Sequence, residues 1–226
     1  MNIFDKQNND FLDYNYICGV DEAGRGPLAG PVVVSAVILK KDAFSTILAD
    51  SKKLSEKTRE SLFDWVIDNS VDYSIVVVSA EEIDRLNILQ ATLHGMKQSV
   101  LNLKIKPNIA LFDGNYDPLK AAGRWSLVAC EPPEPNDKRQ ETSDFSSKAI
   151  IKGDSIYSSI AAASILAKVT RDKIMFDLDK KYPEYNFKKH KGYPTKEHLE
   201  LIIKHGINSE YRTSYKPVKN IIIANS

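Results

Sequence analysis

Apolar runs alternate with helical spacings along this chain, and together they predict a sheet flanked by helices. The stretch from Tyr16 to Leu39 holds two short β-branched segments around a turn rich in Gly and Pro, which predicts a β-hairpin with a long loop. Residues 73–78 form a third β-branched run that we expect to pair with the first two strands. Residues 109–112 are continuously apolar, as in a strand buried on both faces, and residues 149–152 predict one more buried strand.

Helices are predicted between these runs. One extends from about residue 55 to 69, and Ser79 caps another whose apolar positions keep a helical spacing over residues 83–103. A long helix is predicted to start directly after residue 153, and a further helix covers residues 195–205. Strands that alternate with helices indicate parallel neighbours, so the fold class is α/β.

Length and composition predict a globular protein. With 226 residues, of which 42% are hydrophobic, the chain can bury a full core as one domain with a smaller appendage. The net charge of +1 indicates nothing about partners. Cys18 and Cys130 lie in apolar surroundings without metal-ligand spacing, which predicts buried free thiols in a reducing compartment. The sequence shows no signal peptide and no apolar run of 18 residues, so we expect a cytoplasmic protein that does not enter a membrane.

Residues 131–148 differ from the rest of the chain. Prolines, mixed charge and few apolar side chains predict a solvated, flexible insertion loop at this position.

Acidic residues recur where the predicted strands end. Asp21 is predicted to end the first strand, Asp113 ends a later strand, and Asp154 follows the last. Ligands of open α/β sheets bind outside the carboxyl ends of the strands, so these three acids and Glu22 predict an oxygen-rich pocket. Hard oxygen ligands select Mg²⁺ or Mn²⁺, and divalent cations would offset the repulsion between four carboxylates. The alternatives are a helix N-cap for Asp154 and an ordinary turn residue for Asp113.

Two further segments are typical of proteins that bind nucleic acid. Gly24 and Gly26 allow a bend and leave bare backbone N–H groups beside Arg25, which suits the close approach of a phosphate or sugar, although a charged hairpin tip explains the same residues. The basic run 188–193 ends in a rigid Tyr193, as in proteins that stack a ring on a sugar or base, although lysines of this kind often only solubilise a surface. We assign His190 to this basic run, and His198 and His205 to helix surfaces.

Seven segments in this order resemble the bacterial ribonuclease HII family, the type 2 ribonucleases H, over about residues 15–220. They are 19–28 (GVDEAGRGPL), 50–55 (DSKKLS), 82–89 (EIDRLNIL), 112–115 (FDGN), 152–155 (KGDS), 162–172 (AASILAKVTRD) and 190–195 (HKGYPT). A set of this length is far more specific than any single motif. The connection between Asp113 and Asp154 departs from the family, being longer by about 20 residues.

The resemblance implies a ribonuclease H-like fold, a five-stranded mixed sheet flanked by helices, with a small helical C-terminal extension. The expected domains are a tail at 1–14, a catalytic domain at 15–190 and the extension at 191–226. The implied catalytic residues and metal ligands are Asp21, Glu22, Asp113 and Asp154, and the implied substrate-binding residues are Gly24, Arg25, Gly26 and Tyr193. We add Lys52, Lys53, Lys152, Lys188 and Lys191 as phosphate contacts.

The implied activity is that of a monomeric endoribonuclease that uses two Mg²⁺ or Mn²⁺ ions. It would hydrolyse the RNA strand of RNA/DNA hybrids and cut on the 5′ side of ribonucleotides embedded in duplex DNA, leaving a 3′-OH and a 5′-phosphate. Two alternatives stay open: another nuclease of this fold that acts on DNA, and a non-catalytic protein that binds nucleic acid.

Overall fold

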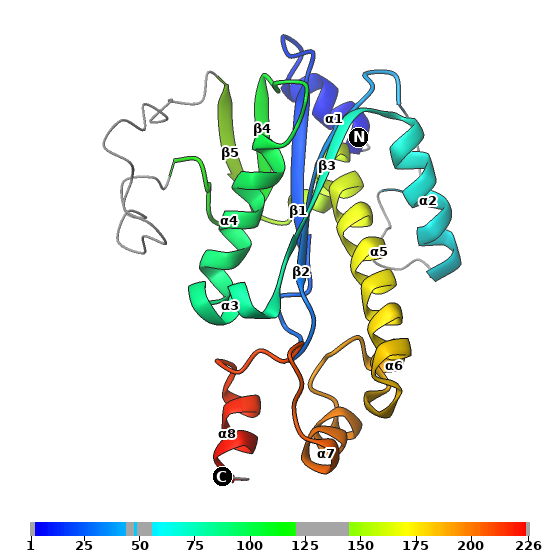
Figure 1. Cartoon of the computed structure of the whole chain (residues 1–226). Helices are drawn as coiled ribbons and strands as arrows, with labels where there is room; N and C mark the ends of the chain where they lie inside the picture. The colour runs from blue at the N-terminus through cyan, green and yellow to red at the C-terminus, as the bar shows by residue number, and fades with distance from the viewer. Residues whose placement is uncertain (1–2, 44–47, 49–55, 121–144, 225–226) are drawn as a thin grey trace.

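Five strands form one mixed sheet in the computed structural model, which describes residues 3–43, 48, 56–120 and 145–224 (Figure 1). The strands are β1 (Ile17–Ala23), β2 (Val32–Leu39), β3 (Ser70–Val78), β4 (Ile109–Asp113) and β5 (Ser146–Ile150). Their spatial order is β3-β2-β1-β4-β5, in which the first two pairings are antiparallel and the last two are parallel. The predicted hairpin and the predicted fold class are confirmed.

The two edge strands depart from the sequence predictions. β3 pairs with β2 alone, because β1 uses its other edge for β4. β5 starts at Ser146, inside the segment predicted to be a loop, and residues 151 and 152 form a turn instead of a strand. The reason is that β5 alternates exposed and buried residues, as an edge strand does, so it has no continuous apolar run to reveal it. The rest of the predicted loop, residues 131–144, lies outside the described residues, as does Cys130, whereas Cys18 is a buried free thiol as predicted.

Helices cover both faces of the sheet (Figure 1). One face packs against α1 (Ile3–Asp10), α2 (Glu56–Asp68) and α5 (Ser158–Lys181), and the other packs against α3 (Ala80–Leu86) and α4 (Ile88–Leu101). Every residue of β2 is buried because its alternate side chains enter the two cores: Val37 contacts the α2 and α5 side, whereas Ile38 contacts the α4 side. None of the helices in the described segments is long and apolar enough to cross a membrane.

The single helix predicted over residues 83–103 is wrong, because Asn87 divides it into α3 and α4. Asn87 has φ 66° and ψ 160°, and its side-chain oxygen accepts hydrogen bonds from the backbone of Leu89 and Gln90 at 3.1 Å. Asn87 is therefore the N-cap of α4. The apolar spacing persists across the break because both helices pack on the same face of the sheet.

Within the segment predicted as a tail at 1–14, residues 3–10 form α1, which packs against the start of α5. Ile3 is buried in the core of that face. The side-chain oxygen of Gln7 accepts hydrogen bonds from the backbone N–H of Ser159 at 2.9 Å and from its hydroxyl at 2.8 Å. Gln7 thus satisfies a backbone donor in the first turn of α5, where the N-cap residue Tyr157 provides no side-chain cap.

The C-terminal segment packs beneath the β1–β2 loop. It contains α6 (Phe187–His190), α7 (Lys196–His205) and α8 (Lys216–Ala224), which lie at the end of the molecule where the β1–β2 loop is found (Figure 1). Leu28 and Ala29 of that loop share an apolar cluster with Phe187 and Tyr211, and Ala29 forms an isolated antiparallel bridge with Tyr211. The loop is therefore held by residues far away in the sequence.

Candidate active site

Strand register places Asp21 beside Asp113. The parallel pairing of β1 with β4 ends at Val20 opposite Phe112, so the next residue of each strand is an aspartate. β1 itself continues to Ala23, paired with β2, which means that the prediction of Asp21 as the end of its strand is wrong. Asp21 still lies where a ligand is expected, because it is the first residue of β1 beyond the parallel pairing. This is the carboxyl end of the parallel strands, where such folds bind their ligands.

Asp21 is buried on the sheet face that α5 covers. Its side chain is 5% exposed and accepts hydrogen bonds from the Glu22 backbone at 2.8 Å and from the hydroxyl of Ser164. Burial raises the pKa of Asp21 well above its usual range, and repulsion from Glu22 and Asp113 raises it further. Glu22 and Asp113 therefore lie close enough to Asp21 to disfavour its ionisation.

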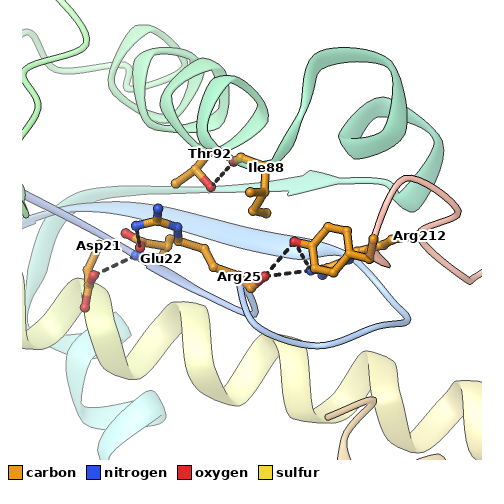
Figure 2. Close-up of polar contacts among 7 residues, drawn as sticks. Asp21, Glu22, Arg25, Ile88, Thr92 and Arg212 are labelled. Atoms are coloured by element: carbon orange, nitrogen blue, oxygen red, sulfur yellow. Dashed lines mark hydrogen bonds and ion pairs between the residues drawn. The ribbon is translucent and has the colours of Figure 1, made fainter. Parts of the chain in front are cut away.

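Glu22 extends from the opposite side of β1, because neighbouring residues of a strand point to opposite faces (Figure 2). Its Oε1 lies 3.3 Å from Nη1 of Arg25. Burial raises the pKa of Glu22, and the nearby Arg25 lowers it, so that the net change is upward.

Asp154 belongs to a short 3₁₀ helix, Gly153–Ser155, that follows β5. The helix N-cap interpretation of Asp154 is wrong, since the N-cap residue of α5 is Tyr157. Asp113 Oδ1 accepts a hydrogen bond of 2.6 Å from the backbone N–H of Gly153, next to Asp154. The same turn brings Lys152, which is exposed and has φ 56°, to this end of the sheet.

The donor set suits a divalent cation, but the side chains do not converge on one point. In the described segments no three Asp, Glu, His or Cys side chains are arranged to hold a metal ion. The reason is visible in their contacts, because Glu22 is turned toward Arg25 and Asp113 toward the backbone of Gly153. Burial and the neighbouring carboxylates raise the pKa of Asp21 and of Glu22, and a hard divalent cation would stabilise their charged forms, so the residue chemistry fits such an ion.

The Gly-Arg-Gly loop and Tyr193 lie together beside these acids. Gly24 has φ +100°, a conformation that L side chains rarely adopt, and a Cβ placed on Gly26 would lie 3.5 Å from Cε1 of Tyr193. The backbone N–H of Leu28 donates to the carbonyl of Gly192 at 2.7 Å, which fixes the loop against the turn that bears Tyr193. Tyr193 is 44% exposed, so its ring is accessible from solvent.

A cleft of about 290 Å³ opens beside this loop, and its lining includes residues to which the sequence assigned no role. It is lined by Glu22, Ala23, Gly24, Arg59, Ser164, Ile165, Lys168, Arg171 and Tyr193. Ser164, Lys168 and Arg171 belong to the 162–172 segment that carries the family resemblance. The sequence therefore marked this segment, but it did not show that these three side chains line a cleft. Burial lowers the pKa of Arg171 to about 10, and its guanidinium carbon lies 5.9 Å from the centre of the Tyr193 ring.

The remaining predicted contacts have mixed outcomes. Lys52 and Lys53 lie outside the described residues.

The assignment of His190 to a basic surface and of His198 to a helix surface is wrong, because both rings are buried and stacked with their centres 4.0 Å apart. Burial lowers the pKa of both, that of His198 to about 4, so the pair is neutral at pH 7. His205 is exposed, as predicted.

Comparison with known proteins gives one consistent result. The family model described as Ribonuclease HII matches residues 18–218. Similar curated proteins named Ribonuclease HII include one from Mycoplasma mycoides subsp. mycoides, 47% identical over 218 residues that cover 96% of this chain and 95% of the relative. Another, from Francisella tularensis subsp. tularensis, is 49% identical over 206 residues, which cover 91% of this chain and 98% of the relative. Among solved structures, ribonuclease H2 from Pyrococcus horikoshii matches with a TM-score of 0.73 and 28% identity, over 92% of this chain and 98% of that one.

Proposed function

Given that this chain belongs to the ribonuclease HII family and is an endoribonuclease of the ribonuclease H type, we propose a specific reaction for it. It hydrolyses the RNA strand of RNA/DNA hybrids and cuts on the 5′ side of ribonucleotides embedded in duplex DNA, leaving a 3′-OH and a 5′-phosphate. The observation that supports this most is the register of β1 and β4, which puts Asp21 beside Asp113, three residues before the start of the Gly-Arg-Gly loop.

The family is one of divalent-metal-dependent nucleases. We assign the metal-binding and catalytic roles to Asp21, Glu22, Asp113 and Asp154, with two Mg²⁺ or Mn²⁺ ions as the cofactors. When bound, such ions would activate a water molecule for attack and stabilise charge on the leaving 3′-oxygen. Because the side chains in the described segments are not arranged around one point, Glu22 and Asp113 would have to reorient from their contacts with Arg25 and Gly153 to hold such an ion.

Recognition of the substrate is assigned to the loop and the tyrosine beside it. The 2′-OH of a ribose can both donate and accept a hydrogen bond, so main-chain groups of Gly24, Arg25 and Gly26 can bind it. This requires a close approach of the sugar to the main chain, which the absence of side chains at Gly24 and Gly26 permits. Tyr193 would stack on the neighbouring deoxyribose and favour a junction at which the next sugar lacks the hydroxyl. Lys152 is assigned to a phosphate, because it is exposed on the turn beside Asp154, and the same role remains proposed for Lys52 and Lys53.

One assay with three substrates tests the proposal. A duplex with a single ribonucleotide, an RNA/DNA hybrid and an all-DNA duplex are each incubated with the protein in Mg²⁺ or in Mn²⁺. Cleavage of the first two substrates and not of the third is the expected result. Cleavage of the all-DNA duplex at a comparable rate would support the alternative nuclease, and absence of divalent-ion-dependent turnover would support the non-catalytic alternative.

The remaining assignments follow from this function. We propose that the protein acts as a monomer in the cytoplasm, where the DNA that contains its substrate is found. We further propose residues 15–190 as the catalytic domain and 191–226 as a C-terminal extension, in which case Tyr193 is contributed by the extension.

A further inference from the structure

The carbonyl groups of the Gly-Arg-Gly loop converge on one buried side chain. Arg212 is fully buried, and its Nη2 donates to the carbonyl oxygens of Gly24 at 2.7 Å and of Gly30 at 2.8 Å. Its Nη1 donates to the carbonyl oxygen of Arg25 at 3.0 Å, and its Nε donates to Gly30 at 3.0 Å. Figure 2 shows Arg212 on the backbone side of Arg25, while the Arg25 side chain extends toward Glu22. One guanidinium thus holds both ends of the loop.

Tyr215 provides a second donor at the same place. Its hydroxyl donates to the carbonyl of Arg25 at 2.7 Å and accepts from Nη1 of Arg212 at 3.1 Å. The carbonyl and N–H of one trans peptide unit point in opposite directions. Because the carbonyls of Gly24 and Arg25 point toward Arg212, the N–H groups of Arg25 and Gly26 point away from it. These are the two N–H groups at the centre of the loop.

A carboxylate on α3 anchors the segment that supplies both side chains. Asp84 accepts hydrogen bonds from the backbone and hydroxyl of Thr213 at 2.7 and 2.6 Å, and from those of Ser214 at 2.9 and 2.5 Å. These two residues lie between Arg212 and Tyr215 in the sequence. Asp84 therefore fixes the backbone from which the two donors reach the loop.

We propose that Arg212 and Tyr215, anchored by Asp84, are positioning residues that set the direction of the loop N–H groups and so determine selectivity for ribose. This inference rests on the proposed function, because it concerns the loop to which ribose recognition is assigned. It explains why two donors are directed at the carbonyl of one exposed residue, Arg25. The competing explanation is that the same contacts only stabilise the fold.

Matched substitutions separate the two explanations. Tyr215→Phe removes one hydroxyl, and Arg212→Lys keeps the charge but loses the forked geometry. Tyr185→Phe is the control, because the Tyr185 hydroxyl donates to the carbonyls of His205 and Gly206 in the same C-terminal cluster but not to the loop. Each variant is assayed well below its melting temperature, so that the folded fraction is the same throughout.

Asp84→Ala tests the anchor in the same way. Its control is Asp72→Ala, because Asp72 accepts backbone hydrogen bonds from Lys104 at 2.6 Å and from Ile105 at 2.9 Å, away from the loop. The two substitutions each remove a partly exposed carboxylate that organises a backbone segment. A difference in activity between them would therefore reflect position and not the loss of an anchor as such.

Two measurements decide the outcome. The first is the single-turnover cleavage rate at a single ribonucleotide, which we expect to fall about tenfold in Tyr215→Phe and up to about 100-fold in Arg212→Lys. The second is the ratio of affinities for the ribonucleotide-bearing and all-DNA duplexes without divalent ions, which should fall about fivefold in both variants. Neither quantity should change in Tyr185→Phe or Asp72→Ala. If Arg212→Lys does not fold, Tyr215→Phe decides the matter alone.

The inference is overturned if Tyr215→Phe keeps the wild-type rate and affinity ratio, or if Tyr185→Phe loses as much. A wild-type protein that cuts no ribonucleotide-bearing strand would refute the proposed function and this inference with it. Active wild-type protein with unaffected variants refutes the inference alone.

Discussion

Alanine at Gly24 should lower the stability of the fold, whereas alanine at Gly26 should slow cleavage, although these glycines are two positions apart in one loop. A Cβ on Gly24 would lie 2.1 Å from Nε and 2.4 Å from Cδ of Arg171, and 2.8 Å from the carbonyl oxygen of Pro31. A Cβ on Gly26 would be no closer than 3.5 Å to the Tyr193 ring, which is ordinary van der Waals contact. The first substitution therefore disturbs the fold, and the second occupies only the space beside Tyr193.

The size of each effect follows from these contacts. The positive φ of Gly24 costs an alanine about 1–2 kcal/mol. Moving Arg171 breaks its 3.1 Å hydrogen bond to Pro31, which adds about 1–3 kcal/mol for a buried group left unpaired. The sum of about 2–5 kcal/mol corresponds to a fall of roughly 10 °C in the melting temperature of a chain of this length. Gly26→Ala should change the free energy of unfolding by less than about 0.5 kcal/mol, but it should slow cleavage at a ribonucleotide by about tenfold or more because the sugar is displaced.

Thermal and urea denaturation measure the first effect, and single-turnover cleavage of a single-ribonucleotide duplex measures the second. Gly206→Ala serves as the control for backbone strain alone, because Gly206 has φ +81° and nothing within 4 Å of its added Cβ. Its stability should fall by less than that of Gly24→Ala. The reasoning fails if Gly24→Ala is as stable as wild type, or if Gly26→Ala cuts at the wild-type rate.

Three further predictions concern the acids, the tyrosine and the buried histidines. Asp21→Asn should abolish cleavage. It should also stabilise the metal-free protein against urea at pH 8, because the raised pKa of Asp21 means that ionising this carboxyl lowers the stability of the folded state. An unchanged or lower stability of the variant would contradict the burial assigned to Asp21. Tyr193→Ala should reduce the cleavage rate at single ribonucleotides about tenfold with little change in melting temperature, and an unchanged junction preference would remove its stacking role. The pKa of His198 is lowered from 6.5 to about 4, so the neutral ring contributes stability that is fully present above pH 6.5 and is lost as the pH falls toward 4. About 2 kcal/mol of the free energy of unfolding should be lost by pH 5. The lowered pKa of His190 acts in the same direction. Urea denaturation at pH 7.5 and 5 of wild type and of His198→Gln tests this, because the variant should lose less stability on acidification.

Local patterns in the sequence were enough to predict the hairpin, the apolar strand that ends at Asp113 and the helix that Thr195 caps. Each depends on residues a few positions apart, where apolar spacing, turn residues and caps act directly on the backbone. The same local reading placed Asp21, Asp113 and Asp154 near strand ends, and the chain order of whole motifs indicated the family that the comparisons confirm.

Only the tertiary structure decided what the remote segments do to one another. Asp21 lies inside β1 and not at its end, and it meets Asp113 because the parallel pairing stops at Val20 and Phe112. His198 belongs to a buried stacked pair, and Arg212, one more basic residue near the C-terminus in the sequence, holds the loop that starts at Gly24. Burial, register and the partners of a long side chain depend on packing between segments up to 190 residues apart, and no pattern along the chain encodes them locally.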